Sequence, residues 1–408
     1  MRAPGAESRQ PWIAVFDLSV TRNSPAGSCV LAEVMGLADQ YDITVFSDAF
    51  DNDRPDHVRW VRVPLPKKPG FLRYMLFHLL APLALRSHIR ERGTNPSLIQ
   101  ATQGQFIGAD ICYPHFCHRA YLANQWNLQK ATGLRRLARW ISYRYNAYSE
   151  RRAFMRARWV VAPSQGLLRE LVATYPFLDG KVRQVANPVD VAHFALPPDF
   201  DRVTERANLG LAPNHKILCF AALGDFERKG LGVVIDSLAR LGDPDIRVLV
   251  VGGREGEISI FRARAKQAGV AERLVFVGFQ SDVRPFFWAS DVFVFPSTYE
   301  IFSLVLIQAP AAGLPVIATR LYGFEEYAEH GRNCWLVDRN PESVRDAIVH
   351  AFADENRRRS VGAMARQAAQ AYSKEQFVAN WQACFQDFLA TSEAASHDNT
   401  LVAAPERS

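Results

Sequence analysis

The sequence predicts an α/β protein with two domains, each built on a parallel sheet. The chain has 408 residues, of which 48% are hydrophobic and 22% charged, so it holds enough apolar material for two cores. Short β-rich apolar runs alternate with helical patterns in both halves of the chain. Strands joined through helices run parallel, and the ligands of such sheets bind beyond the carboxyl ends of the strands.

The stretch 291–337 predicts one strand–helix–strand unit with parallel strands. The expected strands are 291–295 and 314–318, and the expected helix is 302–312, which Gly313 ends. Glu300 would then lie beyond the first strand, together with the free backbone N–H groups of Ser303 and Leu304, where an anion is favoured. The alternative is an ordinary buried unit in which Glu300 only caps the helix.

A second pattern opens the C-terminal half. A strand at 216–223 is followed by Gly-Asp-Phe-Glu-Arg-Lys-Gly at 224–230 and by a helix at 231–241. A glycine-containing loop with two adjacent cations suits a diphosphate, because positive charge stabilises the charge that develops on a leaving phosphate. An isolated Arg-Lys-Gly is mostly a surface feature, but its position ahead of Glu300 favours Arg228 and Lys229 as phosphate ligands.

The residues around Glu300 also carry a family resemblance. Pro-Ser precedes Glu300, seven residues separate it from Gln308, and Ala-Gly-Leu-Pro-Val-Ile-Ala-Thr and Glu325-Glu326 follow. This pattern resembles the signature of the retaining glycosyltransferases of family 4, also called group 1. The resemblance implies an α/β fold of the GT-B type, in which two Rossmann-like domains with parallel sheets face each other across a cleft. It also implies transfer of a hexose from a nucleotide diphosphate sugar to an acceptor hydroxyl, with retention at the anomeric carbon.

The resemblance implies roles for individual residues. Arg228 and Lys229 would hold the diphosphate, and Glu300 with a histidine would orient the sugar. The family has Glu where this chain has Gln308; an amide still accepts from a ribose hydroxyl, but without the strength of a carboxylate. The phosphate loop is similar to that of the lipopolysaccharide-core glucosyltransferases. The predicted donor-binding residues are Gly27, Gly224, Val277, Gly278, Phe279, Phe302, Ser303, Leu304 and Gln308. No metal or other cofactor is expected, because cationic side chains take the place of a metal.

The segment 111–120 contains two candidate histidines. Members of the family often place a histidine near the transferred sugar, and His115 and His118 are equal candidates, with a structural histidine as the alternative. Cys112 and Cys117 lie close by in the sequence, but no second ligand pair follows downstream, which argues against a zinc site. The predicted catalytic residues are His118, His115, Arg228, Lys229 and Glu300.

Gly27 is a weaker candidate in the N-terminal half. A strand at 12–18 is followed by a turn-rich segment, 21–28, and by a helical pattern at 30–37. Relatives have a glycine-rich loop there, which approaches the donor phosphates or the acceptor, and Gly27 is the glycine that remains. A plain turn from strand to helix is the alternative.

Basic residues are concentrated at 130–158. Nine basic residues against Glu150 alone give this segment a net charge of +8, whereas the whole chain carries +6. Interleaved apolar residues predict helices with one apolar and one basic face. Such a surface suits an anionic membrane, at roughly 1 kcal/mol per basic residue, and the segment 71–92 would add to it. The alternative is a solvated basic face over core helices. A nucleic acid is not expected, because no nucleic-acid-binding module is recognisable.

Domain boundaries follow from composition and from the resemblance. We expect an acceptor-side domain at 1–194, a linker at 195–213, a donor-binding domain at 214–371, a helix crossing back at 372–390 and a disordered tail at 391–408. No apolar run is long enough to span a membrane, and residues 1–10 lack the apolar core of a secretory signal. The expected location is the cytoplasm, or the inner face of the cytoplasmic membrane as a peripheral protein. The six scattered cysteines predict reduced thiols.

The expected partners are a nucleotide-sugar donor and a glycan, lipid-linked or lipopolysaccharide-type acceptor. Two other functions stay open. A GT-B scaffold without catalysis is compatible with Gln308, although Arg228, Lys229 and Glu300 argue against it. An epimerase or a phosphorylase on the same fold is the other alternative; an epimerase needs no acceptor, and a phosphorylase needs a cofactor-binding lysine that the sequence does not identify.

Overall fold

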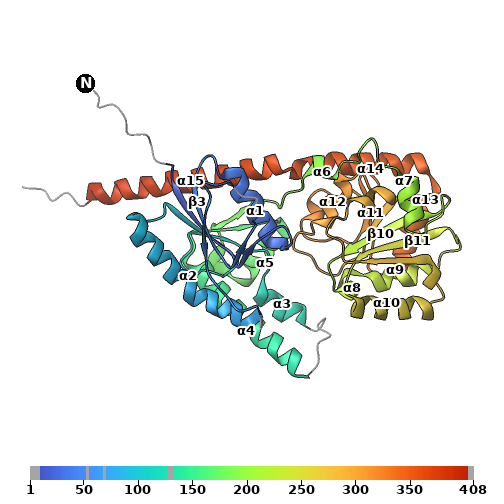
Figure 1. Ribbon diagram of the computed structural model, residues 1–408, viewed down its shortest axis with the longest axis horizontal. Helices are drawn as coiled ribbons and strands as arrows, with labels where there is room; N and C mark the ends of the chain where they lie inside the picture. The colour runs from blue at the N-terminus through green and yellow to red at the C-terminus, as the bar shows by residue number, and fades with distance from the viewer. Residues whose placement is uncertain (1–9, 52–54, 68–69, 127–132, 403–408) are drawn as a thin grey trace, which may run out of the picture. The chain divides into compact units, whose positions relative to one another are not determined.

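The computed structural model describes residues 10–51, 55–67, 70–126 and 133–402 (Figure 1). The chain divides into two compact units, the first formed by residues up to 163, 167–186 and the chain from 375 onward, the second by 164–166 and 187–374. Each unit has a parallel sheet with helices, which confirms the predicted α/β class. Residues 1–10, which are predicted to lack a secretory signal, lie outside the described residues except for Gln10.

The sheet of the first unit has the strand order β5-β3-β1-β6-β7-β8-β9, and every pairing in it is parallel. The strands are β1 (Trp12–Phe16), β3 (Asp42–Ser47), β5 (Arg59–Arg62), β6 (Leu98–Thr102), β7 (Ile111–Tyr113), β8 (Trp159–Ala162) and β9 (Val182–Gln184). A separate pair is formed by β2 (Ser19–Val20) and β4 (Ala49–Phe50). The chain order reverses between β1 and β6, which makes the edge beyond these two strands the expected ligand-binding position.

Helices cover both faces of this sheet. They are α1 (Pro25–Leu37), α2 (Gly70–Arg92), α3 (His118–Asn124), α4 (Gly133–Arg156), α5 (Gln165–Thr174) and α15 (Lys374–Val402), with a 3-10 turn at Pro176–Leu178. Trp12 contacts His88 of α2, while Gln100, in register with Val15, contacts Glu33 of α1. Because Trp12 and Val15 point to opposite faces, α1 and α2 lie on opposite sides of the sheet.

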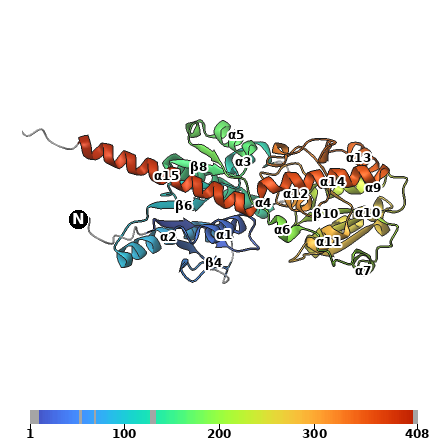
Figure 2. The ribbon, with the colours of Figure 1, turned by 90° about the horizontal axis from the view of Figure 1, so that it is seen from above.

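The C-terminal helix α15 belongs to the first unit (Figures 1 and 2). Its Trp381 is fully buried against Tyr113 of β7, with ring centroids 4.9 Å apart. The predicted returning helix at 372–390 is therefore present. The predicted disordered tail from 391 is wrong as far as Val402, because the polar, small residues there contain no Gly or Pro and continue the helix; residues 403–408 lie outside the described part.

Helix α1 begins earlier than the sequence pattern indicates. Ser24 caps its N-terminus by accepting from the N–H of Gly27 at 3.2 Å, and Pro25 occupies the first turn. Gly27 therefore lies inside the helix and not in a loop, which corrects the predicted turn at 21–28. A Cβ at Gly27 would lie 1.9 Å from the carbonyl oxygen of Ser19, so a close approach to that strand explains the glycine.

The sheet of the second unit has the strand order β12-β11-β10-β13-β14-β15, again with parallel pairings. The strands are β10 (Lys216–Ala222), β11 (Ile246–Gly252), β12 (Leu274–Gly278), β13 (Val292–Phe295), β14 (Val316–Ala318) and β15 (Cys334–Leu336). This is the Rossmann order, in which the chain direction reverses between β10 and β13. The loops after these two strands carry the Arg-Lys pair and Glu300.

The longer helices of the second unit lie on both sides of its sheet. Figure 1 shows the packed pair α9 (Leu231–Leu238) and α10 (Glu255–Gln267) on one side, and the pair α12 (Val305–Ala311) and α14 (Glu355–Ala369) on the other. The other helices are α6 (Val191–Phe194), α7 (Arg202–Asn208), α8 (Phe226–Lys229), α11 (Arg284–Ala289) and α13 (Pro341–Ala353), with 3-10 turns at Ala271–Arg273, Phe324–Glu326 and Gln370–Tyr372.

The segment 195–213, predicted as a linker, is part of the second unit, which begins at Asn187 and not at 214. Asp201 caps α7 by accepting from two backbone N–H groups, and Arg202 and Arg206 of α7 donate to Asp291 at 2.6 and 2.9 Å. Composition alone predicted a linker because the segment is rich in Pro and polar residues. Its ion pairs with Asp291, about ninety positions away in the sequence, attach it to the sheet.

Among the helices within the described ranges, none has the length and hydropathy needed to cross a bilayer.

Candidate functional site

The loops after β10 and β13 contact each other directly. After β10 the backbone turns through Gly224 and a left-handed Asp225 into the short helix α8. Gly230 ends α8 with a φ of +93°, and a Cβ there would lie 2.2 Å from the carbonyl oxygen of Pro296. The N–H of Thr298 donates to the carbonyl oxygen of Arg228 at 2.9 Å. Glycine at 230 is therefore required both by the backbone angle and by the approach of the two loops.

Three of the predicted catalytic residues meet in these loops. Oε1 of Glu300 accepts from Nη1 of Arg228 at 3.1 Å, from Nζ of Lys229 at 2.5 Å and from Oγ of Ser297 at 2.8 Å. Asp225 accepts from Nε of Arg228 at 2.6 Å. Glu300 is about seventy residues away from Arg228 and Lys229 in the sequence. The three residues meet because β10 and β13 are neighbours in the sheet. We call Arg228, Lys229, Ser297 and Glu300 the switch-point cluster.

The switch-point cluster is largely sequestered from solvent. The side chains of Glu300, Lys229 and Arg228 are 10%, 16% and 23% exposed. Burial lowers the pKa of Lys229 from its ordinary value, and the nearby carboxylate of Glu300 opposes that shift. Two cations thus share one carboxylate, which gives the cluster a net charge of +1, and Asp225 beside Arg228 brings the local balance to zero. Two cations that converge on one carboxylate can also pair with an anionic ligand.

The predicted backbone donors lie just ahead of α12, which begins at Val305 and not at 302. The carbonyl oxygens of Ser303 and Leu304 accept from the N–H groups of Leu306 and Ile307 at 3.0 and 3.1 Å. Within the described part of the chain, the N–H groups of Ser303 and Leu304 themselves make no hydrogen bond. Phe302, ahead of the helix, packs against Tyr372 with ring centroids 5.7 Å apart, so its side chain contacts the core.

The other donor-site candidates of the second unit lie in α12 and at the end of β12. Gln308 is in α12, and no hydrogen bond within the described ranges joins its side chain to the cluster. Val277 and Gly278 end β12, and the side chain of Phe279 is 60% exposed beyond them. Because β12 is two strands away from β10, its end lies roughly 10 Å from the phosphate loop.

The two candidate histidines lie in the first unit, beyond the carboxyl end of β7. His115 has its Nε2 buried without a hydrogen-bond partner within the described residues, and burial lowers its pKa to about 3, so it is neutral at physiological pH. His118 begins α3, and its side chain is 13% exposed. Its Nδ1 is 2.8 Å from Oε2 of Glu150, which also accepts from the backbone N–H of His118 at 3.0 Å.

Sequence reasoning missed two residues that hold these histidines. Gln103, with a left-handed φ of 59°, accepts from the N–H of His115 at 2.8 Å and donates to Glu150 at 3.1 Å. Glu150 is fully buried, although the helix pattern indicates a surface acid. The signal was present in the sequence, because Glu150 is the single acidic residue in the basic segment 130–158. Within the described ranges, no group of three or more potential metal ligands is clustered.

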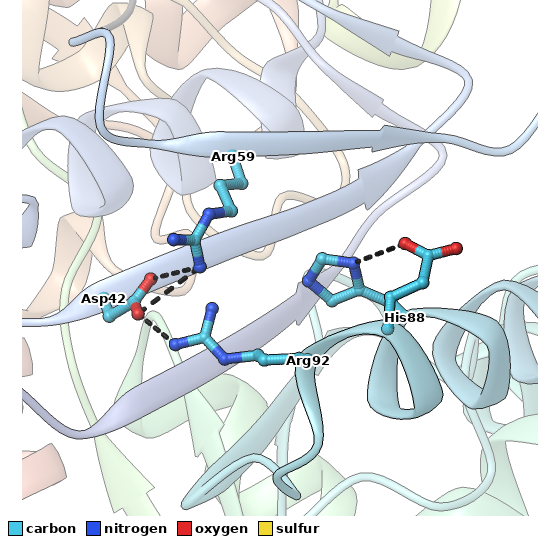
Figure 3. Close-up of a pocket in the computed structure, with 5 residues that line it drawn as sticks. Asp42, Arg59, His88 and Arg92 are labelled. Atoms are coloured by element: carbon cyan, nitrogen blue, oxygen red, sulfur yellow. Dashed lines mark hydrogen bonds and ion pairs between the residues drawn. The ribbon is translucent and has the colours of Figure 1, made fainter.

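A pocket of about 350 Å³ lies elsewhere in the first unit, among residues at the amino end of its sheet (Figure 3). Asp42 accepts from Arg92 and from Nη1 of Arg59 at 3.3 Å, while Nδ1 of His88 is 4.0 Å from Glu91. Figure 3 shows the two guanidinium groups turned toward Asp42. The charges of the lining residues nearly cancel, and none of the predicted site residues is among them.

Solved structures share this architecture. The structure of WaaG, a glycosyltransferase involved in lipopolysaccharide biosynthesis, has a TM-score of 0.71 at 19% identity, covering 90% of this chain and 98% of that one. Anabaena Alr3699/HepE in complex with UDP and glucose has a TM-score of 0.70 at 18% identity, covering 92% and 100%. The two Rossmann-like units are therefore those of the GT-B fold, as predicted.

Two family models match successive parts of the chain. The model described as Glycosyltransferase Family 4 matches residues 26–193, and the model described as Glycosyl transferases group 1 matches residues 214–354. The chain belongs to this family of glycosyltransferases, which confirms the predicted resemblance. It is similar to the D-inositol 3-phosphate glycosyltransferase of Jonesia denitrificans, with 33% identity over 258 residues, 60% of this chain. The chain spans 51% to 58% of the length of this and three further curated relatives.

Proposed function

We propose that this protein transfers a hexose from a nucleotide diphosphate sugar to an acceptor hydroxyl, with retention of anomeric configuration. The switch-point cluster supports the proposal most strongly, because it joins two sequestered cations to one carboxylate at the ligand-binding edge of a Rossmann-type sheet. Family membership and the UDP-bound HepE structure agree with a nucleotide-sugar donor.

In the proposed reaction the bond between the anomeric carbon and the diphosphate oxygen breaks, and the acceptor oxygen bonds to the same face of that carbon. The acceptor proton passes to the departing diphosphate oxygen, so no separate carboxylate base is needed. Arg228 and Lys229 stabilise the charge that grows on the diphosphate. Oε2 of Glu300, which makes no hydrogen bond within the described residues, is available to the sugar hydroxyls while Oε1 stays on the cations.

Gln308 gives a test of the donor site. We expect wild-type protein to bind one of UDP, GDP, ADP or TDP and the matching nucleotide sugar in calorimetry, and Gln308→Glu to bind it more tightly. A carboxylate accepts a ribose hydroxyl more strongly than an amide does, by roughly 1 kcal/mol, or about fivefold in Kd. Gln267→Glu, at the end of α10, is the matched control that adds the same charge away from the candidate ribose position.

The outcomes of this titration separate the proposed functions. Selective binding by the wild type supports a functional donor site. Binding that appears only in Gln308→Glu favours the second candidate, a GT-B scaffold whose natural glutamine has disabled catalysis. If no nucleotide binds to either protein, the donor-site assignment is wrong. Consumption of donor without acceptor, with an epimeric sugar as product, would instead identify an epimerase.

The acceptor in this proposal is carried by a membrane lipid. In the first half of α4 an apolar stripe is exposed at positions that share one face of the helix, and Leu134, Leu137 and Ile141 are 84%, 52% and 44% exposed. Arg135 and Arg136 lie on the adjoining surface. The described part of this helix, 133–156, carries seven arginines and only one acid, the buried Glu150. An uncovered apolar stripe flanked by arginines fits an anionic lipid surface.

We expect wild-type protein to sediment with vesicles that contain anionic phospholipid and to stay in the supernatant with phosphatidylcholine alone. Arg135→Gln with Arg136→Gln should weaken the binding roughly 30-fold, because each basic residue contributes about 1 kcal/mol near such a surface. Arg345→Gln with Arg359→Gln removes two charges from α13 and α14 of the other unit and is the matched control. Equal losses in both pairs would mean that the attraction is only nonspecific.

A further inference from the structure

Glu150 is an unusual charge within the first unit. Its side chain is fully buried in the second half of α4, and its two oxygens accept from five donors. Oε2 accepts from both donors of His118 and from Gln103, while Oε1 accepts from the hydroxyl of Tyr175 at 2.8 Å and faces the thiol of Cys117 at 3.8 Å. Within the described part of the chain, no Lys or Arg pairs with it; His118 is its only ionisable cation.

This environment determines the proton position on His118. A carboxylate can only accept hydrogen bonds, so the contact of 2.8 Å requires a proton on Nδ1. In the neutral ring Nε2 is then a bare acceptor. Glu150 also accepts from the backbone N–H of His118, so one carboxylate holds both the start of α3 and the ring that projects from it.

Asn146, one turn before Glu150 on α4, contacts the other side of the ring. Its Nδ2 lies 3.3 Å from Nε2 of His118, a contact near the upper limit for a hydrogen bond. Its Oδ1 is buried and has no partner among the described residues. A buried amide oxygen without a donor is destabilising unless a ligand or a water supplies one. The single lone pair of Nε2 thus faces a weak donor, which a hydroxyl group could replace, while Oδ1 of Asn146 is buried beside it.

We propose that Glu150 and Asn146 are positioning residues for His118, and that Nε2 of His118 accepts a hydrogen bond from a hydroxyl of the bound sugar. Glu150 holds the ring with Nδ1–H inward. Asn146 contacts Nε2 only weakly, so the stronger hydroxyl donor can replace its amide there. This inference rests on the proposed function for the identity of the ligand, but the state of the ring is independent of it. It also distinguishes the two predicted histidines, because Nε2 of His115 has no such neighbour.

The proton position is measurable on the full chain without substrate. In protein labelled with ¹⁵N-histidine, the signals of His118 are assigned by their loss in His118→Gln. We expect the wild type to show a protonated Nδ1 and a bare Nε2. Glu150→Ala should shift the population to a protonated Nε2, whereas Glu150→Gln should keep the wild-type tautomer, because its amide oxygen can still face His118 while its NH₂ turns to Tyr175. Tyr175→Phe removes a donor from Oε1 only and should leave the signals unchanged.

A wild-type spectrum with protonated Nε2, or an unchanged spectrum in Glu150→Ala, would overturn the role of Glu150. If Glu150→Ala does not fold, Asn146→Asp gives an opposite test: a carboxylate beside Nε2 should draw a proton there, and an unchanged spectrum contradicts the proposal. Kinetically, we expect Asn146→Ala to raise the KM for the sugar substrate roughly tenfold with the tautomer retained, because the ring loses one of the contacts that position it. If the tautomer is as expected but the protein consumes no nucleotide sugar, the proposed function is wrong and the role of Glu150 still holds.

Discussion

Glu300→Ala is expected to lose transfer roughly 100-fold in kcat while keeping its affinity for the nucleoside diphosphate. The carboxylate holds the sugar in position, and misplacing a reacting group by about 1 Å costs a factor of that order. At the same time both cations lose one internal partner, since Oε1 of Glu300 accepts from Arg228 and from Lys229, while Arg228 keeps its pair with Asp225. One internal carboxylate fewer then competes with the diphosphate, so its Kd should stay the same or fall.

The measurement is the rate of transfer, or of slow donor hydrolysis, set beside the calorimetric Kd for the nucleoside diphosphate. Glu329→Ala is the matched control, because that glutamate is 57% exposed and its carboxylate pairs with Arg332 on the surface. A thermal unfolding curve checks that the variant folds. A parallel loss of nucleotide affinity and of transfer would show that Glu300 acts by holding the loops together and not on the sugar.

Lys229→Ala is expected to weaken binding of the nucleoside diphosphate roughly 10- to 100-fold, with little change for the nucleoside alone. A charge-assisted hydrogen bond to a phosphate contributes about 1.5–3 kcal/mol, and a nucleoside has no phosphate to lose it. The loss stops short of complete because Arg228 keeps its charge at every pH of interest. Calorimetry with nucleoside, monophosphate and diphosphate separates this effect from a general disturbance of the site.

The pH dependence of diphosphate binding is a second test of the role of Lys229. Burial lowers the pKa of Lys229, so this lysine loses its proton at a lower pH than an exposed lysine does. Diphosphate affinity should be greatest below that pKa and fall as the pH rises through it, and Lys229→Ala should abolish this step. Lys266→Ala, an exposed lysine on α10, is the control. An unchanged Kd in Lys229→Ala for every diphosphate tested would remove Lys229 from the donor site.

The sequence by itself determined the elements whose cause is local. Alternating apolar runs and helical patterns predict two parallel sheets, because a strand followed by a helix and a strand has one favoured arrangement. Arg228, Lys229 and Glu300 were predictable as a group, because each lies just after a strand and parallel strands end at the same edge. In the structure the three side chains meet at Oε1 of Glu300, while their roles stay predictions.

Local patterns were misleading where contacts distant in sequence override them. The segment around α7 has the composition of a linker, but Asp291 binds its two arginines. Gly27 has the appearance of a loop glycine, but it belongs to a helix that starts at Pro25 and approaches Ser19 closely. In both cases the residue whose contact explains the local structure belongs to another part of the fold.

Glu150 shows most clearly what only the tertiary structure decided. In the sequence it is one acid among arginines, and such a residue ordinarily lies on a solvated helix face. In the folded protein its side chain is buried. There it contacts Gln103, His118 and Tyr175, which are 47, 32 and 25 positions away in the sequence. Helical periodicity gives the direction of a side chain relative to its own helix but not which donors the other elements bring to it. A buried carboxylate is stable only where such donors converge, and their convergence is a property of the fold.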